Sequence, residues 1–140
     1  MRGRSRAVSS LVLLLVVAAV AACSGSGTSS RGSGGMIPIT DFSTVSGTWA
    51  GVASRDVGRQ DDWVEITLKD DGTFQAVSAR QIGVFSGNGK LTLSDGRLTA
   101  TGPRGTAVLT LYDRQGRVLR VDFQDVNGIG YTADLRPKKT

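Results

Sequence analysis

The residues that could perform acid–base chemistry in this chain are two adjacent carboxylate pairs, Asp61-Asp62 and Asp70-Asp71. Two positioned carboxylates can act as general acid and general base. Both pairs lie in turn-like sequence, however, where Asp is expected because its side chain bonds to nearby backbone. The 140 residues contain no histidine, so neither a Ser-His-Asp triad nor a Cys-His pair can form, and the usual ligand of catalytic zinc is missing. The composition predicts a non-enzymatic protein with no cofactor and no metal site.

The only cysteine, Cys23, follows an apolar run over residues 11–22, which is preceded by three arginines within the first six residues. The run is shorter than the roughly 20 residues that a membrane-spanning helix needs, and its charged start is typical of a signal peptide. The four residues Val20-Ala21-Ala22-Cys23 resemble the lipobox of bacterial lipoproteins. An ordinary secretory signal with a chance cysteine is the alternative.

The lipobox resemblance implies that residues 1–22 are a lipoprotein signal peptide and that the Cys23 thiol carries lipid. Acyl chains such as palmitate would then hold the protein on the extracytoplasmic side of a bacterial membrane, either the cell membrane or, in a Gram-negative host, the outer membrane. Two acyl chains on one residue are enough for stable anchoring.

Residues 23–35 comprise Cys23 and a Gly/Ser-rich linker, which predicts a flexible tether with a root-mean-square reach of roughly 20 Å. Residues 36–140 then leave room for one domain. Without the three arginines of the signal, the chain has 14 basic and 12 acidic residues and a net charge of +2. An exported domain this close to neutral is not expected to bind nucleic acid.

Alternating apolar and polar residues predict β-strands throughout this domain, and no stretch has helical periodicity. Val64, Ile66 and Leu68, for example, alternate with polar residues, and Asp-Gly signals favour tight turns between successive strands. Eight strands are predicted, at 47–54, 63–69, 73–80, 84–93, 97–101, 106–112, 118–124 and 129–135. Within the fourth strand, Gly87-Asn88-Gly89 fits either a bulge or a hairpin turn, and the bulge is favoured.

Sequential antiparallel strands with short links leave two exposed edges unless the sheet closes on itself. The predicted fold class is therefore all-β, a small up-and-down antiparallel β-barrel with no substantial helix in the mature chain. The motif Gly47-Thr48-Trp49 at the start of the first strand resembles the lipocalin signature. That resemblance implies that Trp49 closes one end of the barrel, with Arg136 stacked on its ring.

The aromatic residues divide into an inner and an outer set. An eight-stranded barrel is either just filled by its side chains or able to hold one small ligand. The residues expected to line or cap this interior are Trp49, Phe74, Phe85, Phe123 and Tyr131. Trp63 is out of phase with the apolar residues of its strand and is expected to point outward as an interaction residue.

The leading functional prediction is a membrane-anchored lipoprotein that binds a small apolar ligand in the cell envelope. The alternative is a protein-interaction module, such as an inhibitor or an envelope assembly or adaptor protein, with a filled barrel. A small basic cluster, Arg114, Arg117 and Arg120, is interpreted as a solvated and partly paired hairpin face. Contact with anionic lipid headgroups or cell-wall polymer is its second interpretation.

Overall fold

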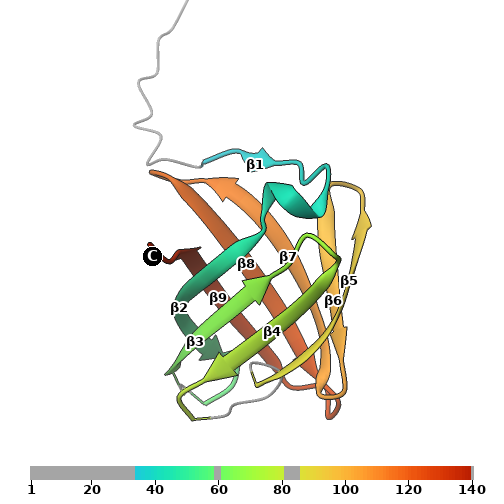
Figure 1. The fold of residues 1–140 in the computed structure, drawn as a ribbon. Helices are drawn as coiled ribbons and strands as arrows, with labels where there is room; N and C mark the ends of the chain where they lie inside the picture. The colour runs from blue at the N-terminus through green and yellow to red at the C-terminus, as the bar shows by residue number, and fades with distance from the viewer. Residues whose placement is uncertain (1–33, 59–60, 81–85, 140) are drawn as a thin grey trace, which may run out of the picture.

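The computed structural model describes residues 34–58, 61–80 and 86–139, and it shows an eight-stranded antiparallel barrel (Figure 1). Each of the eight barrel strands pairs with the next one along the chain, and the last of them pairs back with the first of the eight. The predicted all-β fold and its eight strands are confirmed, with ends that differ by at most three residues. The strands are β2 (Gly47–Arg55), β3 (Asp61–Leu68), β4 (Thr73–Ser78), β5 (Gly87–Ser94), β6 (Arg97–Gly102), β7 (Gly105–Asp113), β8 (Arg117–Asp125) and β9 (Gly130–Pro137).

The inner face of the barrel follows the alternation of each strand. In β3 the buried residues are Asp62, Val64, Ile66 and Leu68, and the residues between them face outward. The side chains that fill the interior are large and almost wholly buried. Leu98, Leu109, Leu111, Leu119, Val121 and Leu135 are each at most 1% exposed.

Four of the predicted lining aromatics, Trp49, Phe74, Phe123 and Tyr131, belong to this core. The Phe123 and Tyr131 rings stack with their centroids 5.6 Å apart. The interior of the barrel is therefore filled by side chains of the core cluster. Phe85, Cys23 and the lipobox lie outside the described residues.

A lead-in before β2 crosses one end of the barrel, and neither of its two short elements was predicted from the sequence (Figure 1). β1 (Met36–Ile37) pairs with β7, and η1 (Phe42–Thr44) is a single 3-10 turn. Between and after them, Ile39 and Val45 are buried in the core. The Ile39 amide donates to the Gly96 carbonyl, at 2.9 Å, and ties the lead-in to the β5–β6 turn. This end of the barrel is therefore covered by chain.

The favoured bulge at Gly87-Asn88-Gly89 is not found, and neither is a hairpin turn at these residues. They are the first residues of β5 and pair with β4 in unbroken register. The glycine at position 89 has a packing reason: a Cβ there would lie 2.1 Å from the Thr101 carbonyl oxygen and 2.7 Å from the Phe74 ring. Gly89 makes room for the buried Phe74 ring. Glycine is therefore needed at this position for close packing and not for a bulge.

Candidate functional site

Trp49 closes the end of the barrel at which β2 begins. Its side chain is 3% exposed, and the indole Nε1 donates a hydrogen bond to the Val45 carbonyl oxygen at 2.8 Å. A buried indole N–H needs such an acceptor. Gly47, with φ at 121°, lies in the left-handed region that favours glycine and leads the chain from η1 into β2. The lead-in and the first strand thus hold Trp49 together.

The turn that supplies Val45 is stabilised by Asp41. The Asp41 carboxylate accepts hydrogen bonds from the Ser43 hydroxyl and from the Thr44 amide, the latter at 2.9 Å. The Ser43 hydroxyl, followed by the Thr44 amide, lowers the pKa of Asp41 below its ordinary value. The Val45 amide in turn donates to the Phe42 carbonyl at 3.2 Å. The acceptor for Trp49 therefore sits in a turn that depends on an ionised aspartate.

The cation above Trp49 is Arg117, so the prediction that Arg136 stacks on the Trp49 ring is wrong. The Arg117 guanidinium carbon lies 5.7 Å from the Trp49 ring centroid, and its Nη2 donates to the Thr44 carbonyl. In the β2–β9 register, Trp49 lies opposite Pro137 and Ala50 lies opposite Arg136. Arg136 therefore faces the other side of the sheet from Trp49, where its Nη1 is 3.4 Å from the Gln115 carbonyl oxygen. A shift of one residue changes the face.

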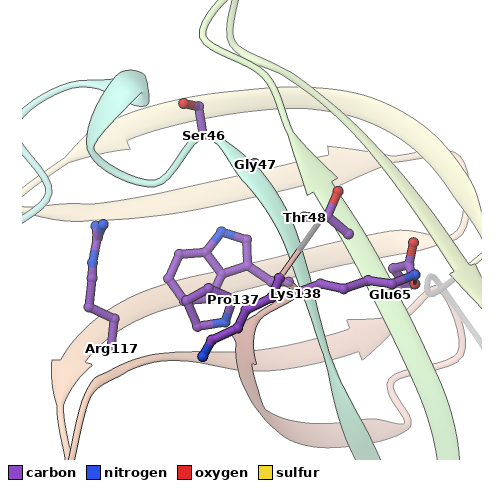
Figure 2. Close-up of a pocket in the computed structure, with 9 residues that line it drawn as sticks. Ser46, Gly47, Thr48, Glu65, Arg117, Pro137 and Lys138 are labelled. Atoms are coloured by element: carbon purple, nitrogen blue, oxygen red, sulfur yellow. Dashed lines mark hydrogen bonds and ion pairs between the residues drawn. The ribbon is translucent and has the colours of Figure 1, made fainter.

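A pocket of about 450 Å³ opens beside Trp49, on the outside of this end of the barrel. Figure 2 shows Arg117 on one side of it and the Lys138 side chain extended toward Glu65 on the other. The Lys138 Nζ is 2.6 Å from Glu65 Oε2, and the Lys138 amide donates to the Thr48 carbonyl at 2.8 Å. The lining residues are Ser46, Gly47, Thr48, Trp49, Glu65, Arg117, Pro137, Lys138 and Lys139.

Three cations and one carboxylate line this pocket together with Trp49 and Pro137, so its net charge favours an anion. Sequence reasoning singled out Arg117 as part of a hairpin cluster and missed Lys138 and Lys139. Their signal was weak: two lysines follow a proline at the end of the last strand.

A second candidate site lies on the outer face of β2, β3 and β4. Trp63 is 54% exposed, as its phase in the strand predicts, and its cross-strand neighbour Val52 is half exposed. Val77 on β4 is equally exposed and pairs with Glu65, the next outward residue of β3 after Trp63. Among the aromatic side chains that the structure describes, only Trp63 is mostly exposed. We call Val52, Trp63 and Val77 the Trp63 face.

Three of the four aspartates in the two carboxylate pairs accept hydrogen bonds within turns or at strand ends. Asp61 accepts from the Ser54 hydroxyl at 2.7 Å, and the buried Asp62 accepts from the Arg80 amide at 2.9 Å. Asp71 accepts from the Thr73 hydroxyl and amide, and these bonds lower the pKa of Asp71. Their backbone and hydroxyl partners explain these aspartates without a reaction.

Within residues 34–58, 61–80 and 86–139, no three carboxylate, histidine or cysteine side chains gather as a metal site would require. Within the same ranges, no helix has the length and apolar character that a membrane crossing needs.

Comparison with known proteins gives no relative. No family model matches the chain, and neither the curated proteins nor the solved structures contain a match. The lipobox and the lipocalin-like signature therefore stay predictions from the sequence.

Proposed function

We propose that this chain is a lipid-anchored extracytoplasmic protein whose barrel is a non-enzymatic protein-interaction module. The observation that carries the interaction module is the contrast between the two faces of the sheet at β3. Inward, Val64 and Leu68 are packed into a filled core, and outward, Trp63 lies open to solvent beside Val52. The membrane anchor is supported by Val20-Ala21-Ala22-Cys23 alone.

Packing of the interior favours this module over a carrier of small apolar ligands. A carrier needs a pocket that buries most of its ligand among apolar walls. Of the aromatic residues expected to line such a pocket, Trp49, Phe74, Phe123 and Tyr131 instead belong to a single core cluster, in which the Phe123 and Tyr131 rings stack. The pocket beside Trp49 opens to solvent and mixes charged groups with Trp49 and Pro137, so it is not an enclosed apolar cavity.

The Trp63 face has the character of an interaction site. Tryptophan is enriched among residues that dominate binding energy, because a large flat side chain buries much area with little loss of conformational entropy. Val52 and Val77 add apolar surface on the neighbouring strands, and Glu65 lies next to Val77. Glu65 is held by Lys138, so the charge beside the apolar face is already compensated.

Photocrosslinking in intact host cells tests the interaction face. A photoreactive phenylalanine analogue is placed at position 63 of the full-length protein, and at the outward-facing Val108 on β7 as the matched control. We expect one defined protein adduct from position 63 that disappears when Val52 is replaced by Asp. Adducts of equal yield from positions 63 and 108 would contradict the proposed face.

Native mass spectrometry of the protein purified from its host tests the carrier alternative. We expect the mass of the lipidated chain alone. An apolar molecule bound one to one would instead establish the carrier. The anchor is tested separately by Cys23→Ser, which should release the protein from membranes. Unchanged membrane association would contradict a thiol-linked lipid.

A further inference from the structure

The described chain begins beside the pocket at the Trp49 end. The Asp113 amide, at the end of β7, donates to the Gly35 carbonyl at 3.1 Å, and β1 then continues along β7. Three residues separate Asp113 from Arg117, the cation above Trp49. Figure 1 shows the described chain starting at the end of the barrel that the lead-in covers. The eleven residues 24–34 join this point to Cys23, and they span at most about 40 Å when fully extended.

Basic side chains gather at the same end. Arg114, Arg117, Arg136, Lys138 and Lys139 all lie in the β7–β8 turn, at the start of β8 or at the end of β9. Two nearby carboxylates are occupied: Asp134 lies 3.7 Å from both Arg114 and Arg120, and Glu65 pairs with Lys138. Asp113 lies cross-strand from Arg117. Within the described ranges, neither Arg117 nor Lys139 forms an ion pair.

The opposite end of the barrel also carries charged groups. Its described residues include the carboxylates Asp56, Asp61, Asp62 and Asp125 together with Arg55, Arg80 and Arg104. Acidic and basic groups are mixed at both ends, because Asp41, Asp70, Asp71, Asp95 and Asp113 lie at the Trp49 end. The excess of basic groups is confined to the pocket, where Arg117, Lys138 and Lys139 face the single carboxylate of Glu65. The small net charge of the chain conceals this local excess.

We propose that the pocket beside Trp49 binds the phosphate-bearing headgroup of an anionic phospholipid in the membrane that anchors the protein. The proposal rests on the anchor at Cys23. Arg117 supplies a planar fork of donors for phosphate oxygens, and Lys138 and Lys139 supply mobile ammonium groups. The pocket, at about 450 Å³, is large enough for a headgroup. The tether keeps the local concentration of lipid high, so weak intrinsic affinity is sufficient.

Headgroup binding orients the barrel. With the Trp49 end against the bilayer, the Trp63 face on the side of the barrel stays accessible to a partner protein. A basic side chain near an anionic surface contributes about fivefold to affinity. Neutralising both lysines of the pocket should therefore weaken binding at least tenfold.

The two indole N–H signals provide the test, because Trp49 lies at the pocket and Trp63 lies away from it. The full mature chain is titrated with dihexanoyl-phosphatidylglycerol below its micelle concentration and followed by proton–nitrogen NMR. Dihexanoyl-phosphatidylcholine and inorganic phosphate are titrated in parallel. We expect the anionic lipid to shift the Trp49 signal, to leave the Trp63 signal unchanged, and to bind at least tenfold more tightly than either reference compound.

Paired variants separate the pocket from general charge. Lys138→Gln with Lys139→Gln should weaken binding at least tenfold, while Arg80→Gln with Lys90→Gln, an equal charge change on exposed residues away from the pocket, should alter it less than twofold. Equal loss in both pairs would overturn a defined site. Equal affinity for inorganic phosphate would overturn the lipid headgroup as ligand, and no Trp49 shift would overturn the pocket. The mass of the amino-terminal residue tests the anchor separately: an unmodified Cys23 would overturn the anchor even where the pocket binds the headgroup.

Discussion

Trp49 and Trp63 lie on the neighbouring strands β2 and β3, and they face opposite sides of the same sheet. Trp49 is 3% exposed and hydrogen-bonded to Val45, whereas Trp63 is 54% exposed beside Val52. The two side chains are chemically identical, so the difference comes from strand phase alone. Buried tryptophan contributes stability and exposed tryptophan offers contact area. We expect substitutions at the two positions to separate these properties.

The largest effect is expected at Trp49. Trp49→Ala should lower the free energy of unfolding by about 3 to 5 kcal/mol, because it removes a buried ring and leaves a cavity at the closed end. Urea unfolding followed by circular dichroism measures this. A loss below about 0.5 kcal/mol would mean that Trp49 does not close the barrel, and the contrast with Trp63 would disappear.

A smaller effect is expected at the cation above Trp49. Arg117→Gln removes the cation from the ring and the donor to Thr44, and should lower the free energy of unfolding by about 1 kcal/mol. Arg136→Gln is the matched control and should change it by less than about 0.5 kcal/mol. A larger loss of unfolding free energy for Arg136→Gln than for Arg117→Gln would mean that Arg136 closes the barrel.

Asp41 should make the stability of the Trp49 end depend on pH. Its folded-state pKa is lowered, so its ionised form stabilises the fold at pH values above the ordinary value of 3.8. That contribution is lost as the pH falls through the lowered pKa. The wild-type protein should therefore lose its advantage over Asp41→Asn on acidification from about pH 5 to below about pH 3. Asp71, whose pKa is also lowered, contributes equally in both proteins. Parallel pH profiles would contradict this role of Asp41.

The smallest effect on stability is expected at the exposed tryptophan. Trp63→Ser should change the free energy of unfolding by less than about 0.5 kcal/mol, because the Trp63 side chain is mostly exposed and is not part of the buried core. The same substitution should abolish adducts formed from a crosslinker placed at Val52. A large loss of stability, with the adduct retained, would assign Trp63 to the fold and leave the partner site elsewhere.

The strands could be predicted because each carries its own signal. Alternation in β3, for instance, identified Val64 and Leu68 as inward and Trp63 as outward. β1 and η1 could not be predicted, since two or three residues are too short for any period to be recognised. The glycines at 87–89 could not be assigned to a bulge, a turn or a regular strand from the sequence. Glycine is needed at position 89 because the Phe74 ring packs there, and Phe74 lies on another strand.

By itself, the sequence determined the number of barrel strands and, in strands such as β3, which residues point inward, because both depend on neighbours a few positions apart. Only the tertiary structure decided that Arg117 rather than Arg136 covers Trp49, and that Lys138 meets Glu65 beside it. Barrel closure pairs β9 with β2 and brings β8 alongside, which joins distant residues such as Trp49 and Pro137, 88 positions apart. Local pattern carries no information on the register of such distant pairs, and a shift of one residue reverses the face of every side chain.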